Sequence, residues 1–185
     1  MPLTTLDPKT ALVLIDLQKG IVARPLAHSV AGVLENARAL ADAFRARGLP
    51  VVLVNVAGRP SGRTEQSWGG DRPPDWADLV PELGAQPTDH LVTKYSPGAF
   101  TKTGLDSRLR GLGVTQIVLA GISTSIGVES TARQAFDDGF NVTFAVDAMT
   151  DMSLDAHNNS LRIFPRFGET GTTRQVLDRL KSQRA

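Results

Sequence analysis

Short apolar segments, separated by stretches of helical periodicity, constrain the fold of this chain more than any other feature. Four of them are residues 11–16 (ALVLID), 50–56 (PVVLVNV), 116–121 (QIVLAG) and 141–147 (NVTFAVD). Residues 90–94 (HLVTK) form a weaker fifth candidate. The first three are almost continuously apolar, which is typical of strands that are covered on both faces. The pattern therefore predicts a largely buried, parallel sheet.

Helical signals lie between these strands. In residues 33–47, the side chains of Val33, Ala37 and Leu40 fall on one helix face, and Gly48 supplies a C-terminal stop. Further helices are predicted over residues 105–112, 127–136, 153–163 and 173–180. Strands that alternate with helices predict a doubly wound α/β fold with right-handed crossovers. A length of 185 residues corresponds to one domain, which we place at residues 1–185.

One long segment lacks regular periodicity. Residues 57–89 are rich in glycine, proline and arginine, and they include Trp68 and Trp76. Such a segment is longer than the usual connection in a compact domain, so we predict a lid or binding loop. The alternative is a surface excursion with one short helix around residues 75–83.

Composition and charge exclude several classes of function. The chain has 20 lysines and arginines against 19 acidic residues, a net charge of +1, so it lacks the basic excess of proteins that bind nucleic acid or anionic membranes. Its apolar runs are too short to span a bilayer, and its first residues lack the apolar core of a secretion signal. It has no cysteine, which excludes disulfides and thiolate nucleophiles. We therefore expect a cytoplasmic protein that binds neither nucleic acid nor a membrane.

Polar residues follow three of the predicted strands. Asp16 ends the first strand and Gln18 lies just beyond it, while Lys94 ends the weak strand. After Gly121, residues 122–127 (ISTSIG) lead directly into a predicted helix, whose N-terminal N–H groups suit an anion or oxyanion. Taken singly, each residue also has a purely structural explanation: Asp16 could be a cap, Lys94 a solvated loop lysine and Gly127 a glycine needed for close packing. Because ligands bind at the carboxyl ends of such strands, their convergence predicts a catalytic site.

Three stretches resemble the isochorismatase-like hydrolases, a family that includes nicotinamidases, carbamoylsarcosine amidohydrolases and isochorismatases. They are ALVLIDLQKGI at residues 11–21, LVTKYSPGAF at residues 91–100, and AGISTSIGVESTARQAFDDGFNVTFAVDAMTD at residues 120–151. The most specific part is GVESTAR at residues 127–133. The resemblance covers nearly the whole chain, and it implies a three-layer α/β/α fold with a mostly parallel sheet of about six strands.

The resemblance implies a catalytic trio with one member replaced. The amidase branches use an aspartate, a lysine and a cysteine, and these positions match Asp16, Lys94 and Gly127. A glycine cannot form an acyl-enzyme, so the thioester route is excluded. The isochorismatase branch also has glycine there, in a context like Ile126-Gly127. Its aspartic acid protonates the terminal carbon of a vinyl ether, and water captures the oxocarbenium ion. Asp16 would then be the general acid for an isochorismate-like compound.

Several features of this site follow only from the resemblance. The substrate would be a small molecule, and the residues that bind it would include Gln18, Ile122, Ser123, Thr124, Ser125 and Ile126. A cis peptide bond between residues 122 and 123 would turn the backbone N–H groups of residues 123–127 toward the substrate. Ser123 stands where isochorismatases carry a tyrosine, so one wall for the substrate ring would differ. Arg59, Arg63 and Gln66, after the second strand, are further candidate substrate contacts. Burial would raise the pKa of Asp16 and Lys94 would lower it, which leaves the direction open.

Two other functions remain open. The missing cysteine fits a non-catalytic pseudoenzyme or metabolite-binding protein of the same fold. An amidase-like hydrolase could instead use activated water or a serine, with Ser123, Ser125 and Ser130 as candidates. Ser125 is the expected helix N-cap, which would occupy its oxygen. A serine nucleophile also needs a base, and the three histidines (His28, His90 and His157) lie outside the motif positions.

No metal or other cofactor is expected. Nicotinamidases of the family hold a metal with an aspartate and two histidines after the second strand, whereas this chain has no histidine between His28 and His90. Glu65 and Asp71 alone make a poor zinc site. The resemblance further implies a homodimer or a larger homo-oligomer. Asp147 and Asp151, after the fourth strand, are expected to act as caps.

Overall fold

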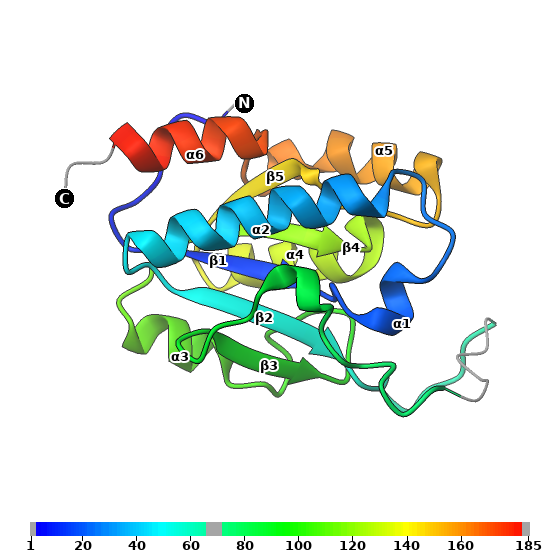
Figure 1. The fold of residues 1–185 in the computed structure, drawn as a ribbon. Helices are drawn as coiled ribbons and strands as arrows, with labels where there is room; N and C mark the ends of the chain where they lie inside the picture. Colours follow the sequence, from blue (N-terminus) through cyan, green and yellow to red (C-terminus); the bar gives the residue numbers. More distant parts are fainter. Residues whose placement is uncertain (1–2, 66–71, 183–185) are drawn as a thin grey trace.

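The computed structural model describes residues 3–65 and 72–182 and contains a six-stranded sheet (Figure 1). The strand order is β3-β2-β1-β4-β5-β6, and every strand pairing is parallel. The chain therefore winds outward from β1 in both directions, with the switch point between β1 and β4. The strands are β1 (Thr10–Ile15), β2 (Val51–Val56), β3 (His90–Lys94), β4 (Gln116–Ile122), β5 (Asn141–Thr150) and β6 (Glu169–Gly171).

Helices cover both faces of this sheet and give a three-layer α/β/α fold (Figure 1). Side chains of α1, α2 and α6 share one apolar cluster with the sheet, and those of α3, α4 and α5 share the other. The α-helices are α1 (Lys19–Val22), α2 (Val30–Ala46), α3 (Leu105–Gly111), α4 (Glu129–Asp137), α5 (Leu154–Ile163) and α6 (Thr173–Ser182). Three short turns complete the fold: the 3₁₀ turns η1 (Pro81–Leu83) and η3 (Phe164–Arg166), and the π-helical turn η2 (Thr124–Val128).

The central strand β1 explains the continuous apolar pattern of its sequence. Leu12 and Leu14 point into the cluster with α2, while Ala11, Val13 and Ile15 point into the opposite cluster. All six residues of the strand are buried, because helices cover both of its faces. The predicted doubly wound fold class is therefore confirmed, and the sheet is fully rather than mostly parallel.

Several element boundaries differ from the prediction. The helix predicted over residues 127–136 is α4, and the turn before it is π-helical rather than α-helical. The short helix that the alternative interpretation placed around residues 75–83 is reduced to η1. The sequence analysis did not anticipate α1 and β6, because four and three residues are too short to show periodicity. The strand β5 runs to Thr150, beyond its predicted end at residue 147.

The segment between β2 and β3 leaves the body of the fold and returns to it (Figure 1). Residues 59–65 are exposed, whereas Trp76 is partly buried against the cluster that includes α2. The partly exposed Lys19 of α1 forms ion pairs with Asp75 and Asp78 of the returning segment. Trp68 lies outside the described residues. Among the helices of residues 3–65 and 72–182, none has the length and apolar character needed to cross a membrane.

Candidate active site

A buried ion pair lies at the carboxyl ends of β1 and β3. Asp16 directly follows β1, and Lys94 is the last residue of β3. The Nζ atom of Lys94 lies 2.8 Å from Oδ2 of Asp16, and it also donates to the carbonyl of Ser96 at 3.2 Å. Only 5% of Asp16 and 2% of Lys94 is exposed. The acid and the base that the sequence predicted at one sheet edge therefore meet there.

The backbone of Asp16 adopts an uncommon conformation. Its φ angle is +51°, in the left-handed region that aspartate and asparagine enter more readily than most residues. The N–H group of Asp16 donates to the carbonyl of Val54 in β2 at 2.8 Å. Asp16 is thus held by the neighbouring strand as well as by the ion pair.

The two oxygens of the Asp16 carboxyl group have different surroundings. Oδ2 accepts the hydrogen bond from Lys94, whereas Oδ1 is buried and has no hydrogen-bond partner. Burial raises the pKa of Asp16 from 3.8 to about 6, against the opposing charge and hydrogen bond of Lys94. The question that the sequence left open is answered: burial outweighs the ion pair. Such a carboxyl group can carry a proton close to neutral pH, as a general acid must.

Gly127 faces this carboxyl group from η2, the turn that follows β4. A Cβ atom placed on Gly127 would lie 3.2 Å from Oδ2 of Asp16 and 2.8 Å from Cγ2 of Ile15. The first distance shows that η2 packs directly against the acid. The second is shorter than real Cβ contacts, so a side chain at position 127 would require Ile15 to move. The structure thus brings together all three residues of the predicted catalytic trio.

The start of η2 corrects one prediction. Ser123 precedes the turn, and Ser125 lies inside it, so Ser125 is not the N-cap. The N–H group and the hydroxyl of Ser125 both donate to Oδ2 of Asp151, at 2.7 and 2.8 Å. The helical path begins earlier than expected because the π turn precedes α4. Asp151 also accepts from the N–H group of Met152 at 2.8 Å, but the N-cap of α5 is Ser153, so Asp151 is not the N-cap of the helix that follows it.

Both polar atoms of the Gln18 side-chain amide form hydrogen bonds within the protein. Its Nε2 atom donates to the carbonyls of Val56 and Trp76 at 3.0 and 3.2 Å, and its Oε1 atom accepts from the N–H group of Val56 at 2.7 Å. These bonds tie the end of β1 to the end of β2 and to the returning segment. They favour a structural role for Gln18, and its predicted substrate contact stays a prediction.

The other predicted binding residues cluster around β4 and η2. The peptide bond between Ile122 and Ser123 is cis, as the resemblance implied. Ile122, Ser123 and Thr124 are buried, whereas Ile126 is 47% exposed. The hydroxyl of Thr124 donates to the carbonyl of Thr150 at 3.0 Å, so this side chain points toward β5. Their roles toward a substrate stay predictions.

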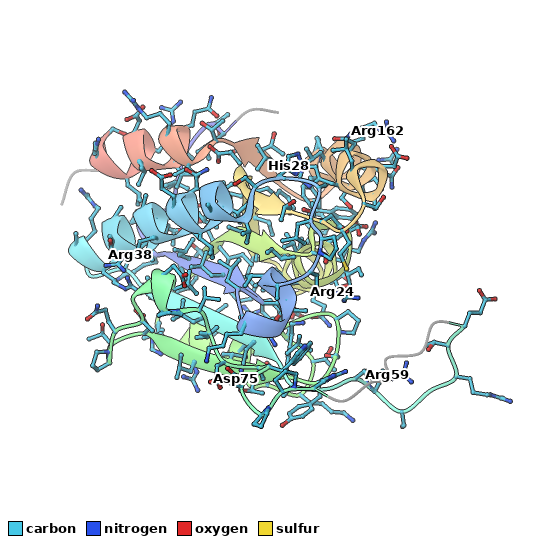
Figure 2. All side chains as sticks on the ribbon, turned by 45° about the vertical axis from the view of Figure 1, so that its right-hand side comes forward. Arg24, His28, Arg38, Arg59, Asp75 and Arg162 are labelled. Carbon is cyan, nitrogen blue, oxygen red and sulfur yellow. The ribbon has the colours of Figure 1, made fainter. Side chains whose placement is uncertain are left out.

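Other candidate residues lie elsewhere. Arg59 stands on the segment that extends away from the sheet and bonds Thr64, and Arg63 is exposed on the same segment (Figure 2). His90 begins β3, at the opposite end of the strand from Lys94. Glu65 is exposed, and Gln66 and Asp71 lie outside the described residues. Within the part of the chain that the structure describes, no three histidine, aspartate or glutamate residues gather as a metal site would require.

Two contacts near the pair escaped the sequence analysis. The carbonyl of Ser96 binds Lys94, which no residue pattern reveals because a backbone atom makes the bond. Tyr95, which is 61% exposed, packs its ring against Gly58, where a Cβ atom would approach the ring within 2.8 Å. An aromatic residue immediately after the strand-ending lysine was the available signal.

Residues 10–175 match the isochorismatase domain. The chain belongs to the isochorismatase family. It is 46% identical over 182 residues to the uncharacterized isochorismatase family protein YwoC of Bacillus subtilis (strain 168), covering 94% of this chain and 95% of that protein. It is 31% identical over 186 residues to an isochorismatase of the same organism, covering 95% and 60%. A solved isochorismatase family protein from Burkholderia thailandensis superposes with a TM-score of 0.92 at 43% identity, covering 96% and 98%.

Membership in the isochorismatase family confirms the resemblance that the sequence motifs carried. It also supports the coarse assignment of this chain as an isochorismatase-family hydrolase. The match spans β1, β3 and η2, the elements that carry Asp16, Lys94 and Gly127.

Proposed function

We propose that this isochorismatase-family hydrolase cleaves the vinyl ether bond of an isochorismate-like compound, with Asp16 as general acid and without a covalent intermediate. The observation that carries the proposal is the Asp16 carboxyl group itself. It is buried, its pKa is raised to about 6, and its Oδ1 atom has no partner in the protein. Because Lys94 occupies Oδ2, Oδ1 is the oxygen that would carry the transferable proton.

The reaction would proceed in three steps. Asp16 donates its proton to the terminal methylene carbon of the vinyl ether, which becomes a methyl group and leaves an oxocarbenium ion. Water adds to the cationic carbon and gives up a proton, which returns to the Asp16 carboxylate. In the resulting hemiketal, the hydroxyl group loses its proton as the bond to the former ether oxygen breaks, and that oxygen takes up a proton, which releases pyruvate and an alcohol. No bond to the protein forms, so a glycine at position 127 is compatible with every step.

Lys94 would serve this cycle in two ways. Its ammonium group stabilises the carboxylate that remains after proton transfer, and its hydrogen bond fixes Oδ2 so that Oδ1 points at the reacting carbon. Residues 57–89 would act as the lid over this site. The hydrogen bond from Gln18 to the carbonyl of Trp76 supports that role, since it fastens the returning part of the segment close to Asp16.

The test is pyruvate release from isochorismate, followed with lactate dehydrogenase. The wild type and an Asp42→Asn control, which changes an exposed carboxyl group on α2, should turn over the substrate. Asp16→Asn should lose about 100-fold or more of the activity, because an amide cannot donate the proton. Wild-type kcat/KM should fall as the pH rises through about 6, where Asp16 loses that proton.

Each other outcome points elsewhere. Equal turnover by wild type and Asp16→Asn would remove Asp16 as the acid. Absence of turnover by the wild type would remove isochorismate as the substrate. Small amides would then test the amidase-like route through water or a serine. Binding of a metabolite with no turnover of any of these would favour the non-catalytic protein of the same fold.

A further inference from the structure

A cavity lies between the first two turns of α2, the end of β5 and α5. Its volume is about 420 Å³, within the range of about 300–1,000 Å³ that small-molecule sites occupy. None of the catalytic trio lines it. Figure 2 shows one of its polar residues, His28, just before the start of α2. The apolar wall consists of Val33, Val146, Met149 and Leu161.

Hydrogen bonds fix the tautomer of His157, which also lines this cavity. The hydroxyl of Thr124 has one proton and donates it to the carbonyl of Thr150 at 3.0 Å. Its oxygen must therefore accept from Nδ1 of His157, which lies 2.8 Å away. The other ring nitrogen, Nε2, then presents a lone pair. Burial and the nearby His28 lower the pKa of His157, against the opposing charge of Asp151, so the ring is neutral near pH 7.

The Nε2 atom of His157 has no hydrogen-bond partner within the described residues. His157 is only 4% exposed, and Nε2 takes part in none of its hydrogen bonds. Over residues 3–65 and 72–182, the buried side-chain polar atoms that lack both solvent contact and a partner are those of Thr10 and Asp16. His157 Nε2 is not among them, so this atom keeps some solvent contact, and His157 is one of the residues that line the cavity.

The neighbouring His28 has the opposite tautomer. The hydroxyl oxygen of Thr150 accepts from the backbone N–H group of His28 at 3.1 Å. The hydroxyl of Thr150 also has a proton to donate, and the acceptor within reach is Nδ1 of His28, which lies 3.0 Å from the hydroxyl oxygen. Nε2 of His28 therefore carries a hydrogen. The two imidazole rings lie 4.7 Å apart between centroids, so the cavity offers a donor beside an acceptor.

We propose that this cavity binds a small molecule that carries a primary carboxamide on a compact apolar or aromatic body. The carbonyl of the amide accepts from His28 Nε2–H, and its N–H group donates to His157 Nε2. The body packs against the apolar wall named above. An ionised carboxylate has no hydrogen to donate to His157, and the carboxylate of Asp147 at the cavity repels it. This site is separate from the Asp16 site and does not depend on its proposed function.

Benzamide is the probe and benzoate the matched competitor, with NMR titration of the Met149 and Val33 methyl groups near neutral pH. Benzamide should bind at least about tenfold tighter than benzoate, the worth of one good hydrogen bond. Leu161→Trp fills the cavity and should weaken benzamide by about tenfold or more. Leu154→Trp places the same change on the same helix at an exposed site outside the cavity, and it should leave the affinity unchanged.

Further variants separate this cavity from the rest of the molecule. His28→Phe removes the donor and should weaken benzamide by about tenfold. Asp16→Asn should bind benzamide like the wild type, whereas loss of binding in that variant alone would place the amide at the ion pair. Equal affinity for benzamide and benzoate, or no binding at millimolar concentrations, would overturn the proposal. The proposal would also fall if the wild type did not bind benzamide and Leu161→Trp changed the oligomeric mass of the protein. That result would assign this surface to contact between two copies of the chain. None of these results bears on pyruvate release.

Discussion

Replacing Lys94 with methionine removes the charge that counteracts the effect of burial on the pKa of Asp16. The buried methionine keeps the length and apolar stem of the lysine while it abolishes the 2.8 Å contact with Oδ2. Asp16 can respond by taking up a proton, so the variant need not hold an unpaired buried charge. We therefore expect Lys94→Met to fold and to carry a neutral Asp16 at pH 7.

The size of the effect follows from the geometry. An opposite charge within hydrogen-bond distance lowers a carboxyl pKa by about 1–3 pH units. Starting from about 6 in the wild type, Asp16 should titrate at about 7–9 in the variant. At about 1.4 kcal/mol per pH unit, Lys94 then stabilises the carboxylate by about 1.4–4 kcal/mol relative to the acid.

The same shift fixes the pH dependence of stability. The folded pKa of Asp16 lies above its ordinary value of 3.8, so the fold favours the protonated form. The stability that this provides is complete below 3.8, declines as the pH rises through about 6, and amounts to about 3 kcal/mol. In Lys94→Met the decline should continue to about pH 7–9.

The assay is an NMR pH titration of protein labelled with ¹³C at the aspartate carboxyl carbons. Asp16→Asn identifies the resonance, and urea unfolding across the same pH range gives the stability. Lys9→Met is the matched control, because Lys9 is exposed just before β1, and it should leave the Asp16 titration unchanged. An Asp16 pKa that stays at about 6 or falls in Lys94→Met would refute the reasoning. A wild-type value near 3.8 would show that burial does not dominate.

Two further predictions concern packing around the site. Gly127→Ala should lower the free energy of unfolding by about 1–3 kcal/mol, because its Cβ atom would meet Cγ2 of Ile15 at 2.8 Å. The control is Gly111→Ala on α3, which has open space around it and should not destabilise the protein. Equal effects of the two variants in denaturant melts would contradict this account. Gln18→Met should cost about 1–3 kcal/mol, because the buried N–H group of Val56 loses its acceptor; an unchanged melting midpoint would show that this bond contributes nothing.

The ends of the strands were the most predictable part of the site. Asp16 and Lys94 each stand at the end of a predicted strand, and the parallel order of the sheet brings such ends together. Gly127 could be placed only through the family motif, since a glycine alone has many structural uses. The fold class followed from the continuous burial of β1, which the run of apolar residues already indicated.

Features that depend on tertiary contacts could not be predicted from the sequence. The π-helical turn moved Ser125 away from the expected N-cap, because no sequence pattern distinguishes the first turn of η2 from an α-helix. β6 has three residues and gains its strand character from pairing with β5. The opposed tautomers of His28 and His157 arise from two threonine hydroxyls on different elements. In the sequence, His28 lies far from Thr124, Thr150 and His157.

The left-handed backbone conformation at Asp16 limits which amino acids this position can accept in a folded protein. With φ at +51°, most side chains crowd their own backbone, and glycine, asparagine and aspartate are the residues that enter this region at low cost. A library covering all substitutions, sorted for folded protein, should therefore be enriched in those three. Glutamate, the other carboxylic acid, is disfavoured by the turn itself before its extra methylene matters. The main chain thus narrows the choice of acid to aspartate independently of the reaction that the acid performs.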